Sequence, residues 1–218
     1  MSGISCQVAS HRTPVVLVHG LSGSADWWQP IVPRLEGERE VRLIDLPQRL
    51  PLEAAADWLA EQLERRVDLV GHSMGGLIAA RVAADRPSLV RRLVLIAPAG
   101  VSPGSRARHV VPLLRALRHT SPRLVPLLAR DALRAGPRTL WRAAGEVLEA
   151  DIRAHLSDIV APTLVLWGGR DALLPPSLGE VVRSEIAGAR LVVLERAGHV
   201  PMSEASEEVS QALAEFLR

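Results

Sequence analysis

Residues 67–84 read VDLVGHSMGGLIAARVAA, and the character of the chain changes in the middle of this stretch. Val67–Val70 is an apolar run typical of a buried strand, whereas from Met74 the apolar residues recur at helical spacing. Ser73 lies at the junction, with glycines at positions 71, 75 and 76. G-x-S-x-G between a strand and a helix indicates a sharp turn that exposes the serine hydroxyl and directs helix N–H groups toward it. The stretch therefore predicts a nucleophilic serine at the end of a strand.

Similar apolar runs alternate with helical patterns along the chain, for example in the segments 52–65 and 74–85. The runs lack a polar face, as strands covered by helices on both sides do. Strands that alternate with helices predict an α/β fold, with a mostly parallel sheet and helices on both of its faces. The expected strands, in addition to Val67–Val70, are Val15–Val18, Val41–Asp45, Arg92–Pro98, Thr163–Trp167 and Arg190–Leu194.

The alternation stops between residues 101 and 154, where only helical patterns occur. We expect a small helical cap, residues 101–154, inserted between two strands of a core formed by residues 1–100 and 155–218. Residues 101–150 contain nine arginines against Asp131, Glu146 and Glu149. A basic cap would attract an anionic substrate, an acidic carrier protein or an anionic lipid surface. The alternative is a solvated helical face without a role in binding.

Composition excludes several classes of protein. The 218 residues carry a formal net charge of only +2, which gives no case for nucleic-acid binding. All 26 basic residues are arginine, and Cys6 is the only cysteine, so no disulfide framework or thiolate metal cluster is expected. Neither a secretory signal nor an apolar run long enough for a membrane span occurs. We therefore expect a soluble, cytoplasmic protein.

A serine hydroxyl needs a base to act as a nucleophile, and the base needs an orienting acid. Among the seven histidines, His199 follows the last expected strand, where the loops of a parallel sheet meet ligands. His72 adjoins Ser73, and its side chain is expected to point away from the turn. Asp171 follows the strand that begins at Thr163, whereas Asp158 precedes that strand and belongs at the opposite edge. The order Ser73, Asp171, His199 predicts a catalytic triad.

A triad of this kind also needs N–H donors for an oxyanion. Residues 18–24, VHGLSGS, end the first expected strand at the same sheet edge, and their glycines would let the Leu21 N–H face the serine. The Met74 N–H is the second candidate. Trp27 and Trp28 would line an acyl pocket or pack in the core, and Trp141 would roof the site or pack within the cap.

These motifs resemble those of the α/β-hydrolase fold superfamily, in particular its capped esterase, lipase and haloperoxidase-like branch. The resemblance covers about residues 13–100 and 156–218. It implies Ser73 as nucleophile, Asp171 as acid, His199 as base, Leu21 and Met74 as oxyanion donors, and no metal or organic cofactor. Three departures affect the pocket mouth: a short N-terminal segment, DLPQRLPLE at residues 45–53 in place of a glycine-rich loop, and a small cap.

The resemblance implies hydrolysis of a small-molecule carboxylic ester through an acyl-enzyme. Carbon–carbon bond hydrolysis, perhydrolysis and acyl transfer use the same triad, and the sequence does not separate them from ester hydrolysis. A small-molecule receptor of this fold that retains the triad without turnover is an alternative from a different class.

Overall fold

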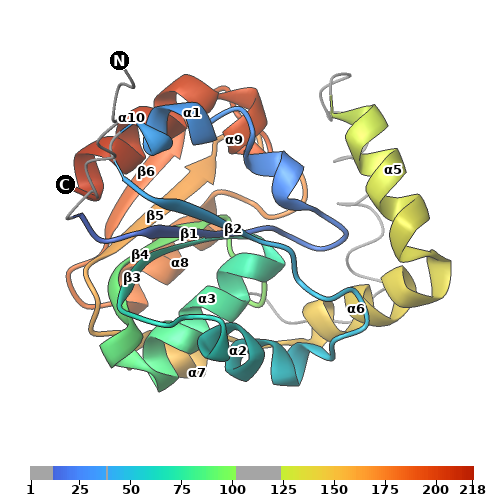
Figure 1. Cartoon of the computed structure of the whole chain (residues 1–218), viewed down its shortest axis with the longest axis horizontal. Helices are drawn as coiled ribbons and strands as arrows, with labels where there is room; N and C mark the ends of the chain where they lie inside the picture. The colour runs from blue at the N-terminus through green and yellow to red at the C-terminus, as the bar shows by residue number, and fades with distance from the viewer. Residues whose placement is uncertain (1–11, 38, 102–123) are drawn as a thin grey trace, which may run out of the picture.

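The computed structural model describes residues 12–37, 39–101 and 124–218. Six strands form one parallel sheet in the order β2-β1-β3-β4-β5-β6, and helices cover both of its faces (Figure 1). The expected α/β fold class is confirmed. The strands are β1 (Val15–Val18), β2 (Val41–Ile44), β3 (Val67–His72), β4 (Val90–Ile96), β5 (Thr163–Gly168) and β6 (Arg190–Leu194).

Alternate residues of the central strands face opposite layers of the core. Val16 and Val18 of β1 pack into one apolar cluster, and Val15 and Leu17 pack into the other. Every residue of β1, β3 and β5 is buried, whereas the edge strands β2 and β6 are only partly buried. The continuous apolar runs in the sequence therefore follow from burial on both faces.

Two groups of helices form the outer layers. In Figure 1 the group that carries α2 and α3 lies below the sheet, and the group with α1 and α10 lies above it. The lower helices are α2 (Leu52–Glu61), α3 (Met74–Asp85), α7 (Arg153–Leu156) and α8 (Ser177–Glu185). The upper elements are the short 3-10 helix η1 (Ala25–Trp28), α1 (Val32–Glu36), α9 (Pro201–Glu204) and α10 (Ser206–Phe216); a second 3-10 turn, η2 (Pro87–Leu89), precedes β4.

Six element boundaries differ from the expected ones; among them, β2 ends at Ile44, β4 ends at Ile96 and β5 ends at Gly168. Strand β3 continues two residues past Val70, because its pairing with β4 extends to His72 opposite Ile96. Strand β4 begins at Val90, and helix α2 ends at Glu61, where Gln62 and Leu63 continue in tighter turns. These shifts matter at the site, since the longer β3 carries the chain directly to Ser73.

Only helices occur between β4 and β5 among the residues described there. They are α5 (Val125–Ala135), α6 (Pro137–Glu149) and α7, and α5 and α6 stand at the right of Figure 1. Gly136, with φ of 78°, makes the turn between α5 and α6, and proline then starts α6. Residues 102–123 of the expected cap lie outside the described residues, so its division from the core stays a prediction.

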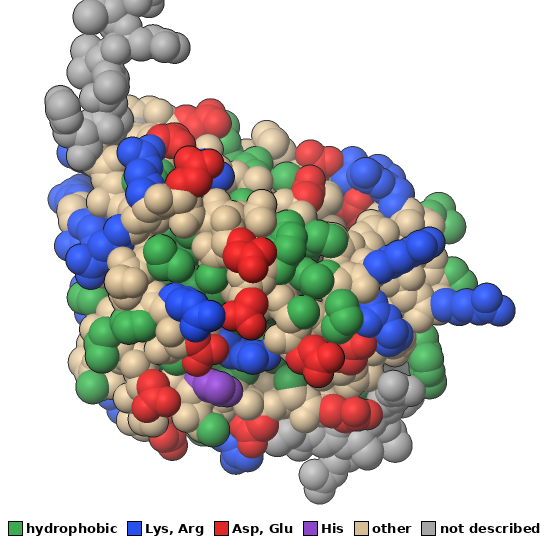
Figure 2. Space-filling model, turned by 60° about the horizontal axis from the view of Figure 1, so that its bottom comes forward, with side chains coloured by type: hydrophobic (Ala, Val, Ile, Leu, Met, Phe, Trp, Pro, Cys, Tyr) green, Lys and Arg blue, Asp and Glu red, His purple; other side chains and the backbone are tan. Residues whose placement is uncertain are grey.

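Charged side chains of both signs are mixed on the lower helical face, which comes forward in Figure 2. Exposed ion pairs such as Arg86–Asp57, at 3.0 Å, contribute little to stability because solvent screens them.

A buried ion cluster lies at the amino ends of the strands, opposite the site. The fully buried carboxylate of Asp68 accepts hydrogen bonds from Arg39 at 3.2 Å and from the Nε–H of Arg91 at 2.8 Å. Both arginines also donate to the carbonyl oxygen of Leu217, at 2.9 and 2.8 Å. One carboxylate therefore links β3 and β4 to the end of the chain.

Replacing this carboxylate should be destabilising, because it removes the buried negative charge that Arg39 and Arg91 both contact. We expect Asp68→Asn to lower the free energy of unfolding by about 3–5 kcal/mol. Asp57→Asn is the matched control, since it removes one exposed partner and should cost less than about 1 kcal/mol. Urea unfolding of both variants checks this, and equal losses would contradict a special contribution from the buried cluster.

Candidate active site

Ser73 occupies a strained turn between β3 and α3. Its φ of 53° and ψ of −117° lie in a region that residues other than glycine rarely adopt. The Ser73 N–H donates to the carbonyl of Ile96 at 2.9 Å, and the Ser73 carbonyl accepts from the Ala99 N–H at 3.0 Å. Hydrogen bonds to β4 and to the loop after it therefore hold the strained residue in place.

The first turn of α3 lies in backbone contact with the end of β1. A Cβ added to Gly75 would lie 2.4 Å from the carbonyl oxygens of both Val18 and His19, so only glycine fits there. The same approach places the loop after β1 beside Ser73: a Cβ on Gly20 would lie 3.1 Å from the Ser73 Cβ. The two segments that the sequence predicts to carry oxyanion donors are thus adjacent.

The structure brings Ser73, His199 and Asp171 together. His199 Nε2 lies 3.1 Å from the Ser73 Oγ, and its Nδ1 lies 2.7 Å from Oδ2 of Asp171. Because a carboxylate accepts, Nδ1 carries the proton and the neutral imidazole leaves Nε2 free to accept from the serine hydroxyl. The arrangement can take a proton from the serine and stabilise the resulting positive charge on the imidazole.

The carboxylate of Asp171 is held rigidly. Its side chain is fully buried, and its second oxygen, Oδ1, accepts the N–H groups of Leu173 and Leu174 at 2.9 and 2.8 Å. The loops of Asp171 and His199 meet backbone to backbone, since a Cβ on Gly168 would lie 2.0 Å from the carbonyl oxygen of Gly198.

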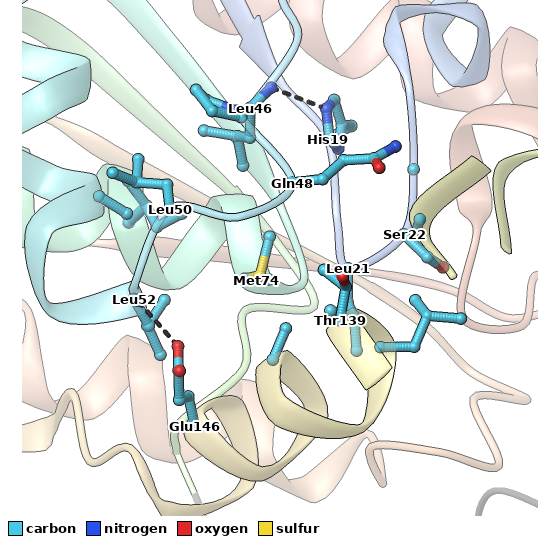
Figure 3. A pocket seen from close by; sticks show the side chains of 17 residues that line it. His19, Leu21, Ser22, Leu46, Gln48, Leu50, Leu52, Met74, Thr139 and Glu146 are labelled. Atoms are coloured by element: carbon cyan, nitrogen blue, oxygen red, sulfur yellow. Dashed lines mark hydrogen bonds between the residues drawn. The ribbon is translucent and has the colours of Figure 1, made fainter. Parts of the chain in front are cut away.

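Leu21 and Met74 both line a small pocket between the core and α6, shown in Figure 3. The lining is mainly aliphatic and includes a few polar side chains. Both residues predicted to supply oxyanion N–H groups thus contribute to the lining of this pocket, which can take an apolar part of a substrate. Its other lining residues are His19, Ser22, Gly23, Leu46, Pro47, Gln48, Leu50, Leu52, Ala55, Ile78, Ala135, Thr139, Leu140, Ala143 and Glu146.

His19 fixes the loop that carries Leu21. Its Nε2 accepts the Leu46 N–H at 3.0 Å, as Figure 3 shows, and its Nδ1–H donates to the carbonyl of Gly20 at 2.8 Å. Burial lowers the pKa of His19, so its ring is neutral at pH 7. In the same view the Leu52 N–H donates to Glu146, which ties α6 to the start of α2.

The three tryptophans named from the sequence do not line this pocket. Trp28 is fully buried in the upper core layer, and Trp27 is 5% exposed there. Trp141 on α6 is 67% exposed, so a position within a cap core is not observed. Contact of these residues with substrate stays a prediction.

Trp27 has a different role, which the sequence did not indicate. Its Nε1–H donates to the buried carboxylate of Asp131 on α5 at 3.0 Å, and the hydroxyl of Ser24 donates to the same oxygen at 2.9 Å. Arg130 donates to the other oxygen. Burial opposes ionisation, but the hydrogen bonds from Arg130, Ser24 and Trp27 outweigh it and lower the pKa of Asp131. The carboxylate therefore links α5 to the segment 24–27, which follows the loop of Leu21.

Sequence reasoning also missed two residues around His199. His72 does not simply point away: its Nε2 lies 2.7 Å from the His199 carbonyl oxygen, and the two rings lie 5.0 Å apart. Glu204 accepts the N–H of Gly198. In the sequence, His72 is marked only by its place next to Ser73, and Glu204 only by its place in the motif around His199. Neither signal specifies these contacts.

Two features are absent from the described residues. No group of three or more His, Cys, Asp or Glu side chains in this part of the chain is placed to hold a metal ion. Across the same residues, no helix has the length and apolar character needed to cross a membrane.

A serine on the turn after a central parallel strand, hydrogen-bonded to a histidine from the last strand's loop, defines the class of α/β hydrolases. The chain belongs to the alpha/beta hydrolase family, whose sequence model matches residues 15–212.

Similar proteins act on esters. The chain is 32% identical over 240 residues to the pimeloyl-[acyl-carrier protein] methyl ester esterase of Neisseria meningitidis serogroup C, with 93% of each chain covered. Among solved structures it resembles a bacterial membrane phospholipase A, with 29% identity and a TM-score of 0.81 over 94% of this chain and 78% of the other. It also resembles an esterase of Thermogutta terrifontis, with 28% identity and a TM-score of 0.77 over 94% of this chain and 89% of the other. With the family match, these relatives make the chain a carboxylic ester hydrolase.

The strain at Ser73 predicts an unusual order of stabilities. Glycine normally destabilises a folded protein relative to alanine by about 0.5–1 kcal/mol. At position 73 we expect the reverse, with Ser73→Gly about 1 kcal/mol more stable than Ser73→Ala, because glycine adopts a positive φ without strain. Urea unfolding of the two variants measures the difference. Ala60→Gly in α2 is the control and should show the normal order, whereas the normal order at position 73 would refute stored strain.

Proposed function

We propose that this enzyme hydrolyses carboxylic esters in two steps through an acyl-enzyme on Ser73. The observation that supports this most directly is the hydrogen-bonded series from Ser73 Oγ through the His199 ring to Asp171, at 3.1 and 2.7 Å. His199 takes the hydroxyl proton as Oγ attacks the ester carbonyl carbon. Asp171 keeps the ring in the productive orientation and stabilises the imidazolium that forms.

The carbonyl oxygen becomes an oxyanion, and the N–H groups of Leu21 and Met74 donate to it. Each such donor stabilises the transition state by about 3–4 kcal/mol in comparable enzymes. The carbon–oxygen bond to the alcohol then breaks, and His199 gives its proton to the departing alcohol oxygen. A water molecule repeats the attack on the acyl-enzyme, which releases the acid and restores Ser73.

Ester hydrolysis is favoured over carbon–carbon hydrolysis, perhydrolysis and acyl transfer by the esterases among its relatives. The aliphatic pocket beside Leu21 and Met74 suits a short acyl chain. A receptor without turnover would have no need of the strain at Ser73, which is costly to keep without a catalytic use.

We further propose that the acyl part of the substrate is presented by an acidic carrier protein. The Neisseria relative is named for an acyl-carrier-protein ester. Of the cap arginines, those at positions 106, 108, 115, 118 and 123 lie outside the described residues. Among the four described ones, Arg130 pairs with Asp26 and Asp131, and Arg142 pairs with Glu146.

Arg134 and Arg138, by contrast, are exposed, and no acidic partner contacts them within the described part of the chain. They lie at the end of α5 and the start of α6, close in sequence to the pocket residues Ala135 and Thr139. An acidic protein docked on these two arginines would hold its acyl group near the pocket.

The nucleophile can be tested with p-nitrophenyl acetate, butyrate and octanoate. Ser73→Ala should lose at least about a thousandfold in kcat and remain folded, because the members of a triad act as a unit. A fluorophosphonate probe should label the wild type once and this variant not at all. Asp171→Asn should lower kcat by orders of magnitude, since the imidazole loses its orientation. Labelling that persists in Ser73→Ala, or a near-normal rate in Asp171→Asn, would contradict the assignment.

The carrier proposal predicts a loss that depends on how the ester is presented. For an ester linked to acyl-carrier protein, Arg134→Glu/Arg138→Glu should lower kcat/KM by about tenfold or more, and high salt should lower the wild-type value several-fold. For a small neutral ester neither change should matter. Arg65→Glu/Arg66→Glu is the control of equal charge, because these exposed residues precede β3 at the opposite sheet edge.

The two alternative ligands of a basic cap are distinguished in the same assay. An equal loss with a free carboxylate-bearing ester would assign the arginines to an anionic substrate, and activation by anionic vesicles alone would assign them to a lipid surface. Identical rates for the double variant and the control with the carrier-linked ester would show that Arg134 and Arg138 have no role in substrate binding.

A further inference from the structure

The catalytic geometry depends on a loop without regular secondary structure. His199 lies between β6, which ends at Leu194, and α9, which begins at Pro201. A catalytic group must be held to within about 0.5 Å of its productive position, and the hydrogen bonds of the His199 ring to Asp171 and Ser73 orient the ring but not the loop backbone. Something else must fix the backbone from which the ring projects.

The first contact that holds the His199 loop comes from His72, the last residue of β3. The buried ring of His72 donates its Nε2–H to the His199 carbonyl oxygen at 2.7 Å. A carbonyl oxygen only accepts, so Nε2 must carry the proton and Nδ1 must be the bare nitrogen of a neutral ring. Nδ1 has no hydrogen-bond partner among the described residues and lies against Gly20, where a Cβ would be 3.0 Å away.

His72 therefore supports the loop without adding charge. Burial, and secondarily the nearby His199, lowers the pKa of His72 well below its ordinary value. A protonated ring at this position would repel the imidazolium that His199 becomes during the reaction, whose ring centroid is 5.0 Å away. A neutral donor avoids this repulsion.

The second support comes from α9. The carboxylate of Glu204 accepts the N–H of Gly198, the residue before His199. The side chain is half-buried, and burial raises the pKa of Glu204, while the Gly198 N–H and His199 act in the opposite direction. A Cβ on Gly198 would lie 2.9 Å from the same carboxylate oxygen, so the contact is tight.

The two contacts hold the backbone on both sides of His199. Glu204 accepts the N–H of Gly198, and His72 donates to the carbonyl of His199 itself. The two side chains come from elements more than 120 residues apart in the chain. Glu204 also places a second negative charge near the ring, in addition to Asp171. The titratable groups that face His199 are thus Asp171 from the loop after β5, His72 from β3 with His19 behind it, and Glu204 from α9.

We infer that His72 and Glu204 are positioning residues for His199. His72 is a neutral donor that fixes the position of the His199 backbone carbonyl, and Glu204 is an acceptor for the Gly198 N–H that also stabilises the imidazolium. This inference rests on the proposed role of His199 as the base. It assigns no contact with substrate to either residue.

The amide side chains of glutamine and asparagine separate the hydrogen bond of His72 from its bulk and polarity. In His72→Gln the amide nitrogen falls near the position of Nε2 and can still donate to the His199 carbonyl. In His72→Asn it falls near the position of Nδ1 and cannot reach. We expect His72→Asn and His72→Leu to lower kcat by about 10- to 100-fold with little change in KM, and His72→Gln to recover most of the loss.

The charge of Glu204 is read from the pH profile of kcat/KM. Glu204→Gln keeps an acceptor for the Gly198 N–H but removes the negative charge that favours the protonated imidazole. We expect the acidic limb of the profile to move to lower pH by a few tenths of a unit or more. Glu207→Gln removes an exposed charge on the next helix and should not move it. The His72 variants should lose rate without moving the limb, since they change no charge.

The outcomes separate this inference from the proposed function. If His199→Ala keeps its activity and its fluorophosphonate labelling, the role of His199 as base fails, and this inference fails with it. If His199→Ala is inactive but folded His72→Asn turns over like the wild type, or His72→Gln is as slow as His72→Asn, His72 does not position the loop. If the acidic limb of Glu204→Gln matches that of the wild type, the electrostatic role of Glu204 is wrong.

Discussion

The strained peptide at Ser73 is the constraint on which the site depends. A serine with φ of 53° persists only where its surroundings determine its conformation more strongly than its own preference does. Here the Ser73 N–H is bonded to Ile96 and its carbonyl to Ala99, so the strand next to β3 fixes the turn on one side. On the other side Gly75 lets α3 touch the end of β1. The same contacts bring the loop of Leu21 beside Ser73, so the strained turn and the proposed oxyanion donors have a common structural basis.

Most of the fold was predictable because two physical patterns act locally. Strands buried on both faces are continuous apolar runs, and β1 and β6 begin and end where the sequence placed them. Parallel strands present all their carboxyl ends at one edge, so the residues that follow β3, β5 and β6 had to be near one another. Position relative to a strand therefore sufficed to choose Asp171 over Asp158, and the contacts of Asp171 with His199 agree with that choice. Boundaries were less certain, since the last two residues of β3 depend on pairing with β4.

Most of the contacts that the sequence did not reveal join segments far apart in the chain. Asp131 receives hydrogen bonds from Ser24 and Trp27, more than 100 residues away, and no periodicity or motif marks that pairing. The same holds for His72 with His199, where the nearness of His72 to Ser73 in sequence suggested the opposite orientation. Trp28 illustrates a third limit, because its aromatic ring is equally suited to a pocket and to a core, and only packing decides.

The charges around the site follow one pattern. The histidines that support it, His19 and His72, are both buried and have lowered pKa values, whereas the carboxyl groups around His199 are those of Asp171 and Glu204. In the proposed reaction, proton transfer from Ser73 creates one new positive charge, on the His199 ring, close to the carboxyl groups of Asp171 and Glu204. Because these groups are fixed before the reaction begins, little reorganisation is needed when that charge forms, and this preorganisation is the source of most electrostatic catalysis. The positions of neutral and charged side chains thus matter to the proposed reaction as much as the three residues that carry it out.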